Sequence, residues 1–345
     1  MKLNRYLIYK INRILKFGIF SLIVFFLMIQ FVAETSFQYP QLFFSFFYGI
    51  VIGLVFENTN NIRFYSKPFL LRNTIRLSIL VIALLLIIAL LRVFFNGFVK
   101  DIDNDGFLPF LWSTDFINLI IPVFIITFFI VLFIELEKHL GGLFIWDFFF
   151  SKYKKPIEEN RIIMFLDLKD STSIAERVGN QKFVEFINLC YSVMTKPLIM
   201  HKATILKYVG DEVILTWPIE KGIKNSKCIN FYFDYNSELE RHKEEFGNKF
   251  GFVPVFKAGV HSGMVTAAFL GTVKKQMDYS GDVMNTTARI QSICNQYDAD
   301  LLISSELFSI LPNDSKFRYS KIGDIELKGK EFKVGVQRVE LTENF

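Results

Sequence analysis

The chain has 345 residues, which is enough for two modest domains. Hydrophobic residues make up 52% of it and its mean hydropathy is +0.34, which argues against a single soluble domain of ordinary composition. The net charge of +5 is too small to indicate a nucleic-acid-binding protein. The three cysteines (Cys190, Cys228 and Cys294) are widely spaced, so we expect neither a disulfide framework nor a zinc site.

Residues 1–137 are apolar blocks separated by short polar breaks, and they predict an α-helical membrane domain with four spanning helices. The predicted spans are residues 17–33, 40–56, 74–95 and 116–134. A cleavable signal peptide is the alternative for the first of them. No small-x-small cleavage site follows it, so a retained anchor is favoured.

Lysines and arginines indicate the orientation of this membrane domain. They lie before the first span, between the second and third spans, and after the fourth: Lys2, Arg5, Lys10, Arg13, Lys16; Arg63, Lys67, Arg72; Lys138, Lys152, Lys154, Lys155. The other two loops hold one lysine, Lys100, and several acids. The positive-inside rule then predicts that both termini and the C-terminal half are cytosolic, in a multi-pass protein of a bacterial inner membrane.

The membrane domain has no ionisable residue in the middle of a predicted span, which argues against a transport pathway. We expect an anchor, a dimerisation element or a sensor, and the residues do not identify a ligand. Residues 138–160 predict a connector, either lying at the bilayer interface through its aromatic residues and lysines or solvated as a plain linker. Residues 161–345 predict a soluble α+β domain.

The first chemical feature of the soluble half is an acidic residue at a strand end. Arg161–Leu168 predicts a strand that ends beside Asp167, and a helix is expected from Thr172, with Ser173-x-x-Glu176 as a capping box. A carboxylate beside a helix N-terminus suits a metal or phosphate site, although many α/β proteins carry an acid there.

A second acidic residue follows at a hairpin tip. Residues 203–216 predict a β-hairpin that turns at Gly210-Asp211. Alone, this pair is an ordinary turn. Together with Asp167, however, Asp211 offers two carboxylates from adjacent strands, an arrangement that can hold two Mg²⁺ ions for nucleotidyl transfer.

Further along, strands Phe252–His261 and Thr266–Tyr279 are expected around Gly259–Gly263. His261 is expected to be a structural histidine, since no second histidine or cysteine lies nearby to form a metal site. A helix is expected from Asp282.

That helix places two polar residues on one face. Asn285 and Arg289 are four residues apart, so an amide and a guanidinium project together, and such groups suit phosphate oxygens. A solvated polar face is the plainer explanation. Residues 327–330, which include Lys328, predict a turn between strands.

Taken in order, these segments resemble the catalytic domain of class III adenylyl cyclases over about residues 161–341. The matching stretches are FLDLKDST, KYVGDE, GVHSG, MDYSGDVMNTTARI and LKGK. The resemblance implies a ferredoxin-like βαββαβ core that works as a head-to-tail homodimer, with ATP as substrate and two Mg²⁺ or Mn²⁺ ions in each site between the two domains.

The resemblance also assigns roles to residues. Asp167 and Asp211 are similar to the two metal-binding aspartates, and Lys207 with Asp278 to the pair that reads adenine. Asn285 and Arg289 are similar to the pair that acts in the transition state, and Lys328 to the lysine that meets the terminal phosphates. In family members the two ends of one hairpin, here Lys207 and Asp211, serve different sites, so a dimer is expected.

Rival functions are a guanylyl cyclase, a diguanylate cyclase and a non-catalytic membrane sensor with a cyclase-like dimerisation domain. Lys207 and Asp278 argue against a guanylyl cyclase, the first of these. Val209 and Val213, on either side of Gly210–Glu212, oppose the second, because diguanylate cyclases have a second glycine and a phenylalanine there. The complete set of catalytic residues opposes the third.

Overall fold

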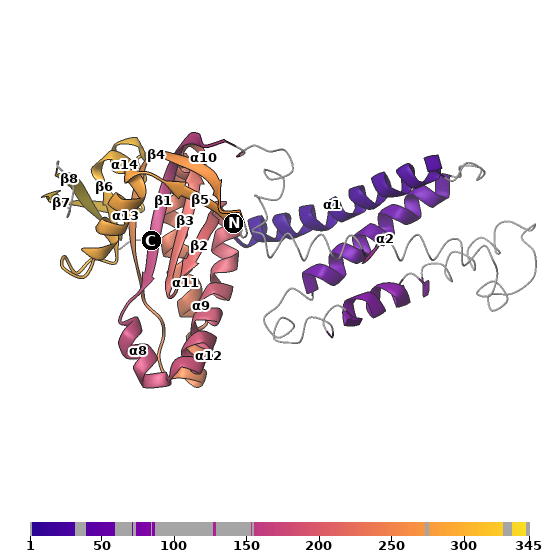
Figure 1. Cartoon of the computed structure of the whole chain (residues 1–345). Coiled ribbons are helices and arrows are strands. Elements are labelled where there is room, and N and C mark those ends of the chain that lie inside the picture. Colours follow the sequence, from indigo (N-terminus) through magenta and orange to yellow (C-terminus); the bar gives the residue numbers. More distant parts are fainter. Residues whose placement is uncertain are drawn as a thin grey trace, which may run out of the picture. The chain divides into compact units, whose positions relative to one another are not determined.

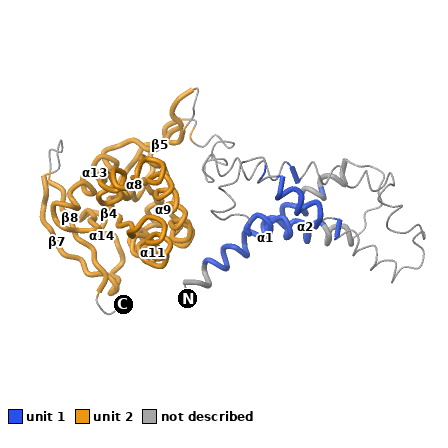
Figure 2. The backbone as a smooth tube through the Cα atoms, turned by 90° about the horizontal axis from the view of Figure 1, so that it is seen from below, with its two compact units in different colours: residues 1–140 blue, residues 141–345 orange. Residues whose placement is uncertain are grey.

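The computed structural model describes residues 2–31, 39–58, 71, 74–83, 85–86, 127–128, 153, 155–272, 276–326 and 333–342. The chain divides into two compact units, residues 1–140 and 141–345, coloured separately in Figure 2.

The first unit contains a pair of packed helices, α1 (Lys2–Phe31) and α2 (Tyr39–Asn58). Glycines allow their backbones to approach closely, because a Cβ added to Gly49 would lie 2.4 Å from the carbonyl oxygen of Phe17. On the same pair, the ring centroids of Phe17 and Phe56 lie 6.0 Å apart. The helix α1 begins well before the predicted span 17–33, since its basic N-terminal segment continues the same helix.

A membrane crossing is not established by these helices. Among the described residues, the helix that is long and apolar enough to span a bilayer is α9 (Asn180–His201), and it belongs to the second unit, where several of its residues are in the core. The apolar segments Ser45–Asn58 and Thr74–Ala83 are shorter. Most of the predicted span 116–134 lies outside the described residues. The four spans therefore stay a prediction.

The second unit is built on an eight-stranded mixed sheet (Figure 1). The strands are β1 (Ile157–Leu168), β2 (Thr204–Val209), β3 (Glu212–Pro218), β4 (Phe256–Leu270), β5 (Gln276–Ser280), β6 (Leu301–Ser304), β7 (Phe317–Ile325) and β8 (Val334–Leu341). They follow the order β2-β3-β1-β4-β6-β8-β7, with β5 paired to β4. The β4–β6 pairing is parallel and the others are antiparallel.

The remaining helices connect these strands. They are α8 (Ser171–Val178), α9, α10 (Ile219–Ile223), the 3₁₀ turn η1 (Lys224–Ser226), α11 (Lys227–Arg241), α12 (Lys243–Phe250), α13 (Asp282–Ser292) and α14 (Ser305–Ile310). The run β1-α9-β2-β3-α11-β4 is a βαββαβ unit with strand order β4-β1-β3-β2, as in ferredoxin-like folds. The predicted α+β core is therefore confirmed.

The side chains of β1 alternate between the two faces of the sheet, and this alternation determines on which face Asp167 lies. Even-numbered residues of 162–168 pack into the core formed with α9, α11 and α12. Odd-numbered Ile163 and Phe165 instead join a cluster with Val283 of α13. Asp167 continues this odd-numbered series, so its side chain lies on the face that α13 covers.

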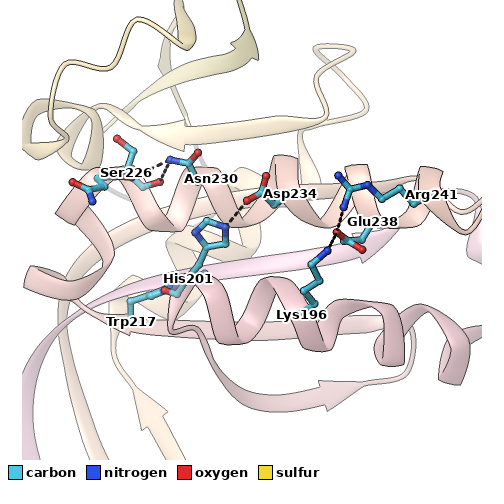
Figure 3. Close-up of polar contacts among 9 residues, drawn as sticks. Lys196, His201, Trp217, Ser226, Asn230, Asp234, Glu238 and Arg241 are labelled. Carbon is cyan, nitrogen blue, oxygen red and sulfur yellow. Dashed lines mark hydrogen bonds and ion pairs between the residues drawn. The ribbon is translucent and has the colours of Figure 1, made fainter. Parts of the chain in front are cut away.

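Polar contacts join α9 to α11 along the outer layer (Figure 3). Glu238 of α11 accepts from Lys196 of α9 at 2.6 Å, and it also pairs with Arg241 at 2.6 Å. At the end of α9, Nε2 of His201 lies 2.8 Å from Oδ2 of Asp234. These contacts fix the two helices that back the sheet.

The capping box and the start of β1 differ from the prediction. The helix α8 begins at Ser171, next to the predicted Thr172, with Asp170 as N-cap in a left-handed conformation (φ 56°) and no capping bond from its side chain. Ser173 therefore lies inside the helix, and the predicted capping box does not form. The strand β1 also begins four residues before the predicted Arg161, at Ile157.

Tyr153, which precedes β1, packs on the sheet of the second unit. Tyr153, in the predicted connector 138–160, is 2% exposed, and its ring centroid lies 6.2 Å from that of Phe269. Its hydroxyl donates to Glu159 at 2.9 Å, and Glu159 in turn accepts from Nε of Arg161 at 2.8 Å. Tyr153 is thus part of the folded second unit.

The expected strand Phe252–His261 does not end at His261, because Gly259–Gly263 lies within the continuous strand β4 (Phe256–Leu270). Its glycines serve close packing. A Cβ on Gly259 would lie 2.3 Å from the backbone nitrogen of Gln291, and one on Gly263 would lie 2.7 Å from Cγ2 of Val283. Both contacts are with α13, so the two glycines set how closely this helix approaches the sheet.

We expect Gly259→Ala to destabilise the protein by about 1–3 kcal/mol and to lower activity, because the new methyl group displaces backbone of α13. Unfolding in denaturant and an assay of the activity that the resemblance implies measure the two effects. Gly247→Ala in α12 is the matched control. Its Cβ would meet nothing within 4 Å, so we expect no loss of stability. Equal stability and activity of the two variants would contradict the packing role of Gly259.

Candidate active site

Two carboxylates meet at the end of the central strands. Asp167 lies near the end of β1, and Asp211 lies in the turn between β2 and β3, with β3 paired to β1. Burial raises the pKa of Asp167, and the neighbouring Asp211 carboxylate raises it further, while a hydrogen bond from Gln291 opposes both effects. Two partly buried acids that repel each other are suited to a cation.

The turn that carries Asp211 accepts a hydrogen bond from a tyrosine of α9. The hydroxyl of Tyr191 in α9 donates to the carbonyl oxygen of Gly210 at 3.0 Å. The rings of Tyr191 and Tyr208 lie 4.5 Å apart between centroids. Gly210 itself has φ +65°, which is the left-handed region that favours glycine. The predicted hairpin and its Gly-Asp tip are confirmed.

A third acid of this group, Glu212, was not among the predicted site residues. Burial, followed by the charges of Asp167 and Asp211, raises its pKa to about 7. The sequence Gly-Asp-Glu indicates that Glu212 belongs to the site, because an acid adjacent to Asp211 at the start of a strand stays close to it. Among the described residues, no set of three or more histidine, cysteine, aspartate or glutamate side chains has the geometry to hold a metal ion.

The raised pKa values predict how pH and metal affect stability. The folded-state pKa values of Asp167 and Glu212 exceed those of the unfolded chain, so the metal-free fold binds these protons more tightly. The contribution of Glu212 to this stabilisation is complete below the ordinary glutamate pKa of 4.5 and is lost as the pH rises through about 7. Mg²⁺ binds the ionised form, so it is expected to raise the melting temperature more at about pH 8 than at about pH 5.5.

Thermal unfolding of the full-length protein, with and without Mg²⁺ at each pH, measures this difference. In Asp211→Ala we expect the Mg²⁺ effect to disappear at both pH values. A Mg²⁺ stabilisation that is equal at the two pH values, or that persists in Asp211→Ala, would show that the metal binds elsewhere.

A lysine that the sequence analysis did not select lies beside the carboxylates. Lys257 of β4 is the register partner of Asp167 across the β1–β4 ladder, and it is only 4% exposed. Directly opposed residues of antiparallel strands project on the same face, so Lys257 and Asp167 lie on the same face of the sheet. Only strand register reveals this proximity, because 90 positions separate the two residues in sequence numbering.

A charged pair joins β2 to β5, which are not paired with each other in the sheet. Lys207 of β2 directs its Nζ to both carboxylate oxygens of Asp278 in β5, at 3.0 Å and 3.2 Å. The backbone N–H of Tyr279 also donates to Oδ1 of Asp278 at 2.9 Å. The two side chains are 29% and 25% exposed, so they are open to a ligand. The sequence prediction that these two residues act as a pair agrees with this contact.

The helix α13 begins at Asp282, as predicted, and carries Asn285 and Arg289 one turn apart. Asn285 is exposed and Arg289 is partly exposed, whereas Val283, Thr287 and Ile290 face the sheet. The guanidinium of Arg289 makes no ion pair with any carboxylate in the described part of the chain.

His261 has a structural role, as expected. Its Nδ1 lies 2.7 Å from Oγ of Ser304, which caps α14 by accepting from the N–H of Leu307 at 3.1 Å. The remaining predicted site residue, Lys328, lies outside the described residues. The structure thus brings Asp167 near Asp211 and Lys207 against Asp278, and it places Asn285 and Arg289 on one helix. No hydrogen bond or ion pair between described residues links these three groups.

Comparison with known sequences places this arrangement in a family. The family model described as "Adenylate and Guanylate cyclase catalytic domain" matches residues 153–339, which is more than half of the chain. The chain therefore belongs to the family of class III adenylate and guanylate cyclases.

Relatives of both kinds are found. Adenylate cyclase 2 of Rhizobium meliloti (strain 1021) is 30% identical over 240 residues, covering 70% of this chain and 64% of the relative. A receptor-type guanylate cyclase of Caenorhabditis elegans is 31% identical over 174 residues, covering 49% of this chain and 13% of the relative. The chain thus spans less than two thirds of the length of either relative.

A solved structure supports the same fold. The structure of a bacterial light-regulated adenylyl cyclase matches with a TM-score of 0.54 at 19% identity, covering 64% of this chain and 65% of that chain. The family contains both adenylate and guanylate cyclases. The preference of this chain for ATP or GTP therefore has to be inferred from the residues of its site.

Proposed function

We propose that this chain is a membrane-anchored adenylate cyclase that converts ATP to 3′,5′-cyclic AMP and pyrophosphate. The observation that carries the choice of ATP is the pair Lys207–Asp278, with contacts of 3.0 Å and 3.2 Å. Adenine presents an acceptor at N1 and a donor at its 6-amino group. Lysine only donates and an ionised aspartate only accepts, so the pair matches adenine, whereas guanine presents the reverse pattern.

The carboxylates fit divalent metal ions. Asp167 and Asp211 supply oxygen donors, and their proximity, visible in the raised pKa of Asp167, leaves negative charge to be neutralised. Mg²⁺ in nucleotide sites is commonly held by one or two carboxylates, with substrate phosphates completing its coordination. This agrees with a site of few protein ligands. Two Mg²⁺ or Mn²⁺ ions bound there would supply charge neutralisation and lower the pKa of the attacking hydroxyl.

The reaction is an internal displacement on ATP. The 3′ oxygen forms a bond to the α-phosphorus, and the bond from that phosphorus to the oxygen that bridges the α- and β-phosphorus atoms breaks. Pyrophosphate leaves with that oxygen, and the hydroxyl proton passes to solvent. Arg289 places fixed positive charge at the crowded phosphorus, where negative charge accumulates. Asn285 orients the ribose, and Lys328 is assigned to the terminal phosphates.

A second copy of the chain completes each site. On α13, the residues that face the sheet belong to the chain's own core, whereas Asn285 and Arg289 face outward. An outward guanidinium that no described carboxylate neutralises is suited to a phosphate held by another subunit. We therefore assign the metal carboxylates of one site to one copy, and the base pair with Asn285 and Arg289 to its partner, in a homodimer.

The N-terminal unit is assigned to the bilayer of a bacterial inner membrane, with both termini in the cytosol, and it is available to regulate the enzyme. The support is the apolar sequence of residues 1–137 and its pattern of lysines and arginines. Alkaline washing of isolated membranes tests this assignment. A protein that is released into the supernatant would contradict a multi-pass anchor.

The base preference is tested by competition. Purified full-length protein receives equal concentrations of ATP and GTP with Mn²⁺, and chromatography separates the two cyclic products. An excess of cyclic AMP supports the assignment. An excess of cyclic GMP would make the chain a guanylate cyclase and overturn the role given to Lys207 and Asp278.

A further inference from the structure

A helix residue outside the predicted site contacts one of its carboxylates. Nε2 of Gln291 donates to Oδ2 of Asp167 at 3.3 Å, across 124 positions of sequence. Among the described residues, this is the side-chain hydrogen bond that connects α13 to the carboxylate group. Gln291 is only partly exposed, so the contact is sheltered from solvent.

The position of Gln291 is fixed by packing as well as by this bond. Gly259 lies so close to α13 that a Cβ there would come within 2.3 Å of the Gln291 nitrogen and 2.7 Å of its Cα. In the β1–β4 ladder, Gly259 pairs with Phe165, two residues before Asp167. The backbone of Gln291 therefore rests on the sheet beside the carboxylate that its side chain contacts.

Helix geometry separates this residue from the outward pair. Each residue turns the helix by about 100°, so Gln291 lies about 200° around α13 from Arg289. One side of α13 thus meets the carboxylate of its own chain, while the other side carries the groups assigned to the partner's site.

We propose that Gln291 is a positioning residue that orients Asp167 for metal binding; this rests on the proposed function. A donated amide hydrogen occupies one carboxylate oxygen and leaves the other directed toward the metal. Groups that hold a metal-ligating carboxylate in this way commonly contribute about 10–100-fold to metal affinity or activity. Because the same helix carries Asn285 and Arg289, a shift of α13 at one site of the dimer would also move the carboxylate of the other.

The test measures metal binding apart from catalysis. Full-length protein is mixed with 3′-deoxy-ATP, which lacks the attacking hydroxyl, and bound Mn²⁺ is measured from the loss of the free-ion electron paramagnetic resonance signal. We expect Gln291→Met, which keeps the length but loses the donor, to raise the Mn²⁺ dissociation constant by about tenfold. Saturating Mn²⁺ should restore most of its cyclase activity.

Two variants serve as comparisons. Ser292→Ala, at the neighbouring exposed position, should bind Mn²⁺ like the wild type. Gln291→Asn keeps an amide on a shorter side chain, so its Mn²⁺ dissociation constant should lie between those of the wild type and Gln291→Met. Gln291→Asn also provides the test if Gln291→Met does not fold.

Unchanged Mn²⁺ affinity in folded Gln291→Met, or in Gln291→Asn when only that variant folds, would overturn the role of Gln291 and leave the proposed function intact. A wild-type protein that binds no Mn²⁺ with the nucleotide would instead overturn the proposed function, and this inference with it.

Discussion

A cell that makes both an Asp167→Ala chain and an Arg289→Ala chain is expected to regain cyclase activity that neither chain has alone. Each single variant should lose about 10²-fold or more, because either the metal carboxylates or the transition-state charge is missing from both sites of its dimer. In the mixed dimer, one site contains both substitutions and the other site contains neither. With random pairing, about a quarter of wild-type activity should return.

The physical basis is the division of groups between two surfaces of one chain. Asp167 lies on the sheet, whereas Arg289 faces outward from α13. Two affinity tags, one on each chain, allow mixed dimers to be purified in sequence before the assay.

The matched control pairs Asp167→Ala with Asp211→Ala. Both defects fall in the same carboxylate pair, so each site of that mixed dimer lacks one metal ligand and no activity should return. Verified mixed dimers of the first pair that remain inactive, or equal recovery in the control, would contradict a site shared between subunits.

The second large effect concerns the base. In a Lys207→Glu, Asp278→Asn double variant we expect a preference for GTP, because the glutamate accepts from guanine N1–H and the asparagine amide donates to O6. Two mismatched hydrogen bonds, at about 1–3 kcal/mol each, should lower kcat/KM for ATP by about 10²-fold or more. Initial rates with each nucleotide, measured across a range of concentrations, give the ratio.

Asp278→Asn alone is the control for this prediction. It breaks the ion pair with Lys207 and should weaken ATP use without creating good GTP use, since the lysine, itself a donor, still faces the N1–H donor of guanine. A double variant that is folded and keeps the ATP preference of the wild type would show that Lys207 and Asp278 do not read the base.

Much of the site could be predicted because its parts are local in sequence. The hairpin that ends in Gly210-Asp211, the start of α13 at Asp282 and the spacing of Asn285 and Arg289 all depend on neighbours within a few residues. The pairing of Lys207 with Asp278 is not local, and it was predicted only through the resemblance to cyclases.

The residues that were missed depend on tertiary packing. The sequence predicted two strands around Gly259 and Gly263, but these glycines lie within one strand, β4, and make room for α13 on it. Lys257 approaches Asp167 through strand register, and Gln291 reaches Asp167 through helix packing. No pattern within either segment carries this information.

The early start of β1 has a similar explanation. Residues 157–160 alternate between partly buried and exposed positions, and three of them, Glu158, Glu159 and Asn160, are polar, so they do not form an apolar run. Their place in the strand comes from pairing with β4, where Ile157 lies opposite Ala267. The register of a partner strand therefore extends β1 beyond its hydrophobic core.

The most direct test of the central claim is product formation from ATP alone. Purified full-length protein is incubated with ATP labelled at the α-phosphorus and with Mg²⁺ or Mn²⁺, and the label is followed by chromatography, with Asp211→Ala as control. We expect the label in cyclic AMP, equimolar pyrophosphate, and no cyclic product from the control. Label that stays in ATP or appears in non-cyclic products, with metal and nucleotide bound to a folded protein, would contradict an adenylate cyclase.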